Sequence, residues 1–140
     1  MVIVMLSILS ATALPKFFEK NTFAERAFFD DCLNALRYAQ KLAVATNCDV
    51  QVSFSSNEYK LKRPKVRDNC RSLAPLSDSD LDNVKHPSTG ENYSGDESGV
   101  STSTSTVVFY ALGNASADTT ITVGSNSIKV VAKTGFVYAP

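Results

Sequence analysis

The sequence predicts an α+β fold in which one long N-terminal helix packs on an antiparallel β-sheet. Apolar residues recur at helical spacing across the first third of the chain, and the later segments alternate apolar and polar residues between turn residues. Because each amphipathic element needs a partner for its apolar face, we expect the helix and the sheet to cover one another.

Length and composition limit the choice of function. A chain of 140 residues with 44% hydrophobic residues fits one domain with a modest core. The 14 basic residues balance 14 acidic residues, so the overall charge does not attract nucleic acid or anionic lipid. Any such affinity must come from a local patch.

The first 14 residues, MVIVMLSILSATAL, are apolar or small and precede Pro15. As a helix they rise about 21 Å, which is less than the roughly 30 Å hydrocarbon core of a bilayer. Ala11-Thr12-Ala13 resembles a signal cleavage site, but no basic residue precedes the apolar run. A secretion signal, a buried helix and part of a membrane span are the alternatives at this point.

Residues 16–46 predict one long helix without internal Pro or Gly. Asn47 is a suitable end, because Asn tolerates the left-handed conformation that terminates helices. Pro15 then predicts a kink between the apolar segment and this amphipathic helix. The apolar stripe of the helix consists of Phe28, Cys32, Ala35, Leu36, Ala39, Leu42 and Ala43.

Five or six antiparallel strands are expected after the helix. The first two form a hairpin, and residues 68–98 are rich in turn residues and predict no regular element. The second half of the helix is expected to pack on one face of the sheet. The predicted strands cover residues 49–54, 59–62, 106–111, 119–123, 127–132 and 136–139.

These segments together resemble type IV pilins and type II secretion pseudopilins. Ala13-Leu14-Pro15 matches an Ala-x-Pro element near the middle of the N-terminal helix of that family. Residues 36–45 resemble the second half of the helix in the GspH/FimT group of minor pilins. Residues 121–124, 128–130 and 134–137 resemble the closing strands of that group.

The resemblance implies a pilin-like fold with two parts. Residues 1–15 are the expected transmembrane and filament-core segment, and residues 16–140 the expected periplasmic domain. The leader, the methylated Phe and the Glu of the family would lie before Met1, so we expect the apolar run to be the remainder of a longer helix. The expected filament-core residues are Val2, Ile3, Val4, Leu6, Ile8, Leu9 and Leu14.

The resemblance also implies a function and a location. It implies a structural minor pilin or pseudopilin that primes or caps a filament, for instance a mannose-sensitive haemagglutinin-like pilus. The location would be the bacterial inner membrane, with a single span, and then the filament. The implied partners are other major and minor pilins, the inner-membrane assembly platform and prepilin peptidase. A secreted domain behind a cleaved signal remains an alternative.

Three cysteines are present. Hairpin pairing brings Cys48 and Cys70 near each other, and the extracytoplasmic location implied by the resemblance favours a disulfide between them over two thiols. Cys32 lies on the apolar stripe and is expected to be a buried, unreactive thiol.

A basic cluster follows the first predicted hairpin turn, and it has two interpretations. Some members of the resembled group bind DNA for uptake, so the cluster is a candidate phosphate-binding site. The favoured alternative is an edge strand whose charges prevent edge-to-edge pairing, because Tyr59 is its only aromatic neighbour. The cluster consists of Lys60, Lys62, Arg63, Lys65, Arg67 and Arg71.

No metal site, cofactor or catalytic constellation is expected. The cysteines contain no CxxC pair, and His86 lies far from them in the sequence. The alternating carboxylates at 78–82 resemble the start of a calcium loop, but Asn83 and Thr89 occupy the positions that need Gly and Glu. The sequence therefore predicts a structural protein and not an enzyme.

Overall fold

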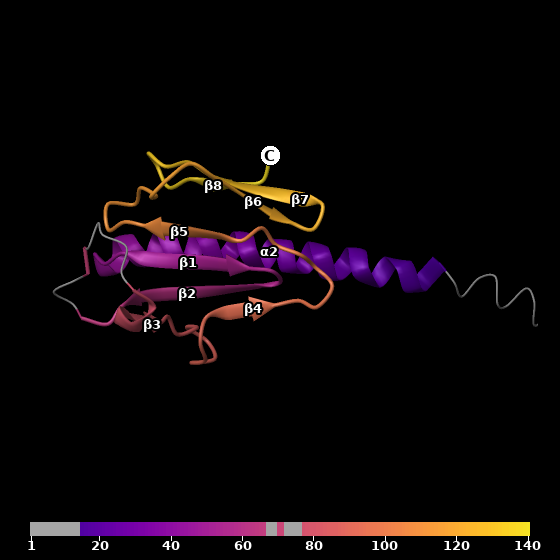
Figure 1. Cartoon of the computed structure of the whole chain (residues 1–140), viewed down its shortest axis with the longest axis horizontal. Coiled ribbons are helices and arrows are strands. Elements are labelled where there is room, and N and C mark those ends of the chain that lie inside the picture. Colours follow the sequence, from indigo (N-terminus) through magenta and orange to yellow (C-terminus); the bar gives the residue numbers. More distant parts are fainter. Residues whose placement is uncertain (1–14, 67–69, 72–76) are drawn as a thin grey trace, which may run out of the picture.

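The computed structural model describes residues 15–66, 70–71 and 77–140. Its longest element is the helix α2 (Pro15–Thr46), which lies along the β-strands and extends past them at its N-terminal end (Figure 1). At the other end, Asn47 has a φ of 55° and the Cys48 amide donates a hydrogen bond to the Ala43 carbonyl at 3.2 Å. This Schellman-type ending confirms the predicted helix and its termination at Asn47.

The larger sheet is antiparallel and has the strand order β3-β2-β1-β5, with β4 also paired to β2. The predicted hairpin is confirmed, since Val52 pairs with Leu61 across β1 and β2. Alternate residues of β1 and β2 are buried against the core. The strands of this sheet are β1 (Val50–Ser55), β2 (Glu58–Pro64), β3 (Leu81–Asn83), β4 (Ser94–Asp96) and β5 (Ser105–Phe109).

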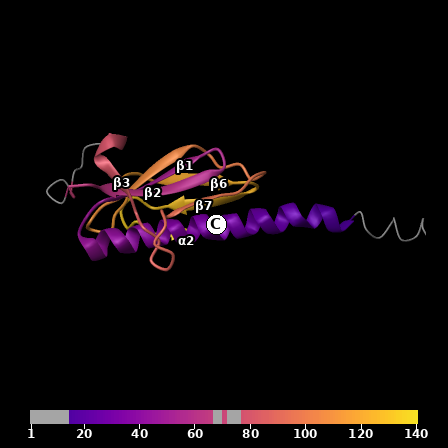
Figure 2. The same cartoon turned by 90° about the horizontal axis from the view of Figure 1, so that it is seen from below.

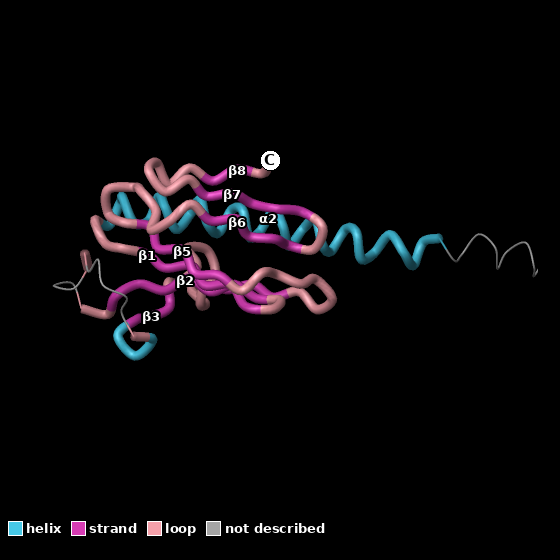
Figure 3. Tube along the Cα trace, turned by 45° about the horizontal axis from the view of Figure 1, so that its top comes forward, coloured by secondary structure: helices cyan, strands magenta, loops and turns pink. Residues whose placement is uncertain are grey.

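The last three strands form a second antiparallel sheet, so the predicted strands are divided between two sheets. These strands are β6 (Thr119–Val123), β7 (Asn126–Val130) and β8 (Val137–Tyr138), in that order. The loop after β5 turns the chain away from β1, and the segment before β5 joins the two parts through the Thr102 to Val123 bridge and a hydrogen bond from the Ser103 amide to the Thr122 carbonyl at 3.0 Å. Figure 3 shows the two groups of strands side by side along α2.

The apolar stripe of α2 fills the space between the helix and both sheets. Six of the seven predicted stripe residues are buried, and Leu42 packs against the core while half exposed. Figure 2 shows that both sheets lie on the same side of the helix. The sheet residues that complete the core include Val50, Val52, Phe54, Leu61, Val107, Phe109, Ile121, Val123, Ile128 and Val130.

Residues 68–98 contain more regular structure than predicted. A 3-10 turn, η2 (Asp78–Asp80), precedes β3, and both β3 and β4 pair with β2. The sequence hides these strands because each has only three residues, too few to show an alternation of apolar and polar residues. Between them, Val84 and Tyr93 hydrogen-bond to each other and to Leu61, so residues 84–93 form a hairpin anchored on β2.

The contact between two glycines yields a stability prediction. Gly135 has a φ of 63°, and a Cβ there would overlap the Gly113 carbonyl oxygen and lie 2.6 Å from Gln40 Nε2. Gly135→Ala should therefore lower the free energy of unfolding by about 2–4 kcal/mol, measured by urea denaturation.

Gly90→Ala is the matched control. Gly90 also has a positive φ, 73°, but a Cβ added there would meet no atom within 4 Å. Gly90→Ala should lower the free energy of unfolding by only about 1 kcal/mol, which is the cost of the backbone strain. Equal losses for both variants would contradict the role of the close contact.

Candidate functional site

The outer face of α2 is the largest uncovered helical surface in the described part of the chain. Exposed residues follow one another at alternating spacings of four and three, on the side opposite the buried stripe. Phe23 is 71% exposed and Val44 is 53% exposed, which is unusual for apolar side chains of this size. This outer stripe consists of Phe23, Ala27, Asp30, Asn34, Arg37, Lys41 and Val44.

The N-terminal part of α2 leaves the domain beside the turn that joins β6 and β7 (Figure 1). Glu25 Oε1 accepts hydrogen bonds there from the Ser125 amide at 2.7 Å, the Ser125 hydroxyl at 2.5 Å and the Asn126 side-chain amide at 3.2 Å. A side chain at Gly124 would collide with the Glu25 carboxylate, because its Cβ would overlap the carboxyl carbon. This Glu25 clamp fixes the point at which the helix arm departs.

The Glu25 clamp also changes the acidity of its carboxyl group. The Ser125 side-chain and backbone hydrogen bonds favour the ionised form and lower the pKa of Glu25 below its usual value.

A shallow cavity of about 440 Å³ lies beside the clamp and is lined by Thr22, Arg26 and Phe29. Sequence reasoning missed Glu25, because the partner residues are 100 positions away.

The opposite end of α2 is fastened by the disulfide between Cys48 and Cys70, whose Cα atoms are 4.5 Å apart. The Asp49 amide donates to the Cys70 carbonyl at 2.6 Å, and Asp49 Oδ1 accepts from the Ala111 amide at 3.0 Å. Asp49 is almost fully buried, and this burial raises the pKa of its carboxyl group. The disulfide, β1 and the loop after β5 are thereby connected.

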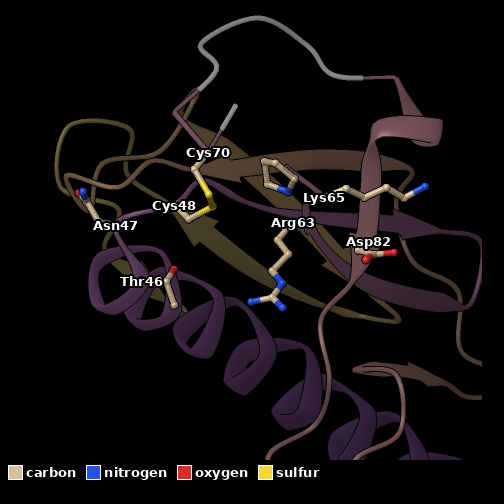
Figure 4. Close-up of a pocket in the computed structure, with 8 residues that line it drawn as sticks. Thr46, Asn47, Cys48, Arg63, Lys65, Cys70 and Asp82 are labelled. Atoms are coloured by element: carbon tan, nitrogen blue, oxygen red, sulfur yellow. A yellow bond between two sulfur atoms is a disulfide. The ribbon is translucent and has the colours of Figure 1, made fainter. Parts of the chain in front are cut away.

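A cavity of about 470 Å³ lies next to the disulfide (Figure 4). Thr46, Asn47, Arg63 and Asp82 contribute to its walls. Figure 4 shows the Arg63 side chain reaching toward α2, whereas Lys65 points away from the helix. Its described lining is mostly polar and includes the basic side chains of Arg63 and Lys65 and the carboxylate of Asp82.

The basic cluster does not form one continuous surface. Because side chains alternate along a strand, Lys60 and Lys62 lie on one face of β2 and Arg63 on the face toward α2. The edge-strand interpretation is wrong, since β2 is flanked by β1 on one side and by β3 and β4 on the other.

Local acceptors engage several members of this cluster. Lys60 forms an ion pair with Glu58 at 2.7 Å, and Lys62 pairs with Asp78. Lys65 donates to the Ser79 carbonyl at 2.7 Å, and Arg71 donates to the Asn47 side chain. Arg67 falls outside the described residues. The described members are thus divided between two faces and partly neutralised.

Cys32 lies in the core with no exposed surface, as the apolar stripe predicts. Burial raises the pKa of its thiol to about 12, so the thiol stays protonated and unreactive near neutral pH. Across the described residues, no cluster of three or more His, Cys, Asp or Glu side chains is arranged to hold a metal ion.

The N-terminal predictions fall largely outside the described residues. The filament-core residues between Val2 and Leu14 and the segment before the Pro15 kink are not among them. Within the residues that the structure describes, no helix combines the length and the apolar character needed to cross a bilayer.

A comparison with known protein families identifies the family to which this fold belongs. The family described as type II transport protein GspH matches residues 30–135, which is most of the chain and includes α2 from Asp30 together with all the strands except β8. The chain belongs to the GspH family. Proteins of this family and of the related pilins are structural subunits, which assigns the chain a structural role in a pilus or pseudopilus and other such subunits as partners.

The three-dimensional comparison supports the fold. The structure is similar to the type IV minor pilin FimU of Pseudomonas aeruginosa, with a TM-score of 0.51 and 12% sequence identity over 85% of this chain and 91% of FimU. At that identity the similarity establishes the pilin fold alone. No curated protein sequence matches the chain significantly. The predicted α+β, pilin-like fold and the GspH/FimT resemblance are confirmed.

The Glu25 clamp yields a pH-dependent prediction. Since the pKa of Glu25 is lowered in the folded state, its ionised carboxylate stabilises the fold above the ordinary Glu pKa, and this contribution disappears as the pH falls through the folded-state pKa. Glu25→Gln should therefore lower the Tm at pH 7, and its difference from the wild-type protein should shrink as the pH falls below the ordinary Glu pKa.

Circular dichroism melts at several pH values would test this. Glu91→Gln is the control, because the Glu91 carboxylate accepts no hydrogen bond from any described residue. If the Tm difference between Glu25→Gln and the wild-type protein is the same at pH 7 and pH 3, the effect does not come from the charge of the Glu25 carboxylate.

Proposed function

We propose that the chain is a minor pilin or pseudopilin subunit that takes part in the initiation or capping of a filament. The observation that carries the proposal is the single continuous helix that leaves the domain past its sheets. A helix of this kind supports assembly because it carries the N-terminal segment into a filament core while the domain stays at the surface.

The proposal includes a cellular route. Residues 1–15 would hold the subunit in the bacterial inner membrane with residues 16–140 in the periplasm. The helix would then pass into the filament core, where the apolar residues between Val2 and Leu14 pack against neighbouring helices and Pro15 sets the bend. The expected partners are major and minor pilins, the inner-membrane assembly platform and prepilin peptidase.

The disulfide is consistent with this route. Disulfides persist in oxidising compartments such as the periplasm, and here the bond fastens the loop after β2 to the end of α2. A 22-residue separation corresponds to about 3 kcal/mol of stabilisation in the chain-entropy account. The bond therefore favours a domain that folds outside the cytoplasm.

Breaking the arm without unfolding the domain tests the role in assembly. Ala27 is exposed and lies just before Phe28, the first buried residue of the core. Ala27→Pro should interrupt the helix there and abolish incorporation into filaments, whereas the domain should stay folded with a lower Tm, because a proline inside a helix costs about 3 kcal/mol. Immunoblots of sheared filaments from cells expressing the variant measure incorporation.

Ala27→Ser is the matched control, because it changes the same side chain and keeps the backbone hydrogen bond. This control should enter filaments as the wild-type chain does. If Ala27→Pro also enters filaments normally, or if deleting the gene leaves filament number and secretion unchanged, the proposed role in assembly is wrong.

DNA binding by the basic cluster is the second candidate, and the geometry argues against it. Lys60 and Lys62 lie on the opposite face of β2 from Arg63, whereas Lys65 and Arg71 lie beyond the strand, and local acceptors leave few positions that phosphates can bridge. In a gel-shift assay with duplex DNA at low salt, we expect the double variant Lys60→Glu/Lys62→Glu to bind DNA no differently from the wild-type chain. A loss of DNA binding by about tenfold or more in this variant would instead favour the uptake function.

A further inference from the structure

The outer face of the second sheet carries a row of side chains that crosses its three strands. Thr120 of β6 pairs with Lys129 of β7, and Lys129 pairs with Tyr138 of β8. Residues that pair directly across antiparallel strands share one face of the sheet. This face is turned away from the core, because the adjacent Val130 and Val137 are buried. Thr120 and Lys129 are exposed, and Tyr138 is half-buried.

A cavity of about 250 Å³ lies along this row. Its polar lining includes Asp118, Thr120 and Lys129, and Val131 and Tyr138 add apolar surface. Pockets for drug-sized molecules are larger, at about 300–1,000 Å³. The cavity therefore suits a ligand, or one unit of a longer ligand, of the size of a single small ring.

An aromatic pair borders this cavity. Phe136 and Tyr138 have ring centroids 5.7 Å apart and an angle of 20° between their ring planes. Phe136 is 59% exposed, although Phe is among the residues that proteins most often bury. The pair thus extends an apolar surface beyond the cavity, next to its polar groups.

Two charged groups of the cavity remain available to a ligand. Asp118 Oδ1 accepts a hydrogen bond from the Ala132 amide at 2.7 Å, which orients the carboxylate and leaves Oδ2 without a partner among the described residues. Lys129 forms no ion pair within the described part of the chain. On the first sheet, by contrast, Lys60 is paired with Glu58 at 2.7 Å.

The chemistry of these groups selects a class of ligand. A carboxylate accepts hydrogen bonds and an ammonium group donates them, whereas a hydroxyl group does both and can bind to either. One negative and one positive group also favour a neutral ligand, because a charged ligand is attracted by one and repelled by the other. The electron-rich faces of aromatic rings attract C–H groups. A sugar ring is neutral, carries several hydroxyl groups and presents C–H groups on its faces.

We propose that the outer face of the second sheet binds a neutral carbohydrate. One sugar ring occupies the cavity, where Asp118 accepts hydrogen bonds from its hydroxyl groups and Lys129 donates to them. The Thr120 hydroxyl lies in the same row and adds a further donor and acceptor. The C–H face of the ring packs on Tyr138, and the next ring of an oligosaccharide packs on Phe136.

This site goes beyond the proposed assembly function and does not depend on it. None of its residues belongs to α2, so they can be changed without altering the helix that leaves the domain. Variants of the site should enter filaments with wild-type yield. A failed binding test therefore leaves the assembly role in place, and a failed filament test leaves the carbohydrate site in place.

The fluorescence of a single tryptophan tests the proposal, because the chain contains no Trp. Phe136→Trp is introduced into the full chain, which is held in micelles of a detergent without a sugar headgroup. Titration with cellotriose, a neutral chain of three glucose rings, should change the Trp emission in a saturable way. Phe23→Trp is the matched reporter, since Phe23 is 71% exposed on α2, and its emission should not change.

Two further substitutions in the Phe136→Trp chain test the charged groups. Asp118→Asn keeps an acceptor for the Ala132 amide, and Lys129→Met keeps the length of the side chain. Each should weaken cellotriose binding about tenfold, because hydrogen bonds to charged groups are the stronger ones. Lys85→Met changes an exposed lysine outside this face and should bind as the parent chain does. Lys129→Met alone decides the test if Asp118→Asn melts early.

A measurement on the wild-type chain avoids any effect of the Trp reporter. In nitrogen–proton correlation NMR spectra, cellotriose should shift the amide signals of Thr120, Lys129 and Tyr138. The absence of these shifts would overturn the proposal. No saturable change with Phe136→Trp, an equal change with Phe23→Trp, or undiminished binding by the charge-removing variants would also overturn it.

Discussion

The structure depends on one constraint: a single apolar stripe on one helix serves as the common core surface for two separate sheets. Among the described strands, none of one sheet pairs with a strand of the other, and the Thr102 to Val123 bridge links the segment before β5 to β6. Leu36, Cys32 and Ala39 lie fully buried between them. Without the helix, each sheet would expose an apolar face, so neither is expected to be stable alone.

This constraint explains why polar contacts cluster at the two ends of the packed helix. Glu25 binds the turn between β6 and β7, and Gln40 binds the loops that precede β6 and β8. Both interactions attach the second sheet, which has three short strands and the smaller share of the core. The disulfide and Asp49 serve the first sheet in the same way. The helix is thus fixed in position and in rotation, which leaves the same outer face exposed along its length.

Sequence reasoning succeeded where the physics is local. The periodicity of α2, its end at Asn47 and the hairpin of β1 and β2 depend on residues that are neighbours in the chain. The three-residue strands β3 and β4 were missed, because their pairing is decided by the free edge of β2 and not by their own residues. The edge-strand interpretation of the basic cluster failed for the same reason.

In the candidate site, too, the features set by neighbouring residues could be predicted and those set by long-range contacts could not. The exposed residues of α2 follow from its periodicity, whereas the Glu25 clamp requires knowledge that residues 25 and 125 meet in space. The division of the chain into two sheets likewise depends on the loop after β5, whose turn at Tyr110 and Gly113 carries no strong pattern. Family resemblance supplied the fold, but it did not supply these contacts.

The distance in sequence between Glu25 and its partners has a consequence for the synthesis of the chain. The contacts of Glu25 with Ser125 and of Arg37 with Val137 each span 100 residues, so they can form only when almost the whole polypeptide has left the ribosome. Contacts of such long range slow folding, since a large loop must close before they are gained. During this interval the apolar stripe of α2 is exposed to solvent. Early insertion of the N-terminal segment into the membrane, as proposed above, would limit aggregation of the nascent chain.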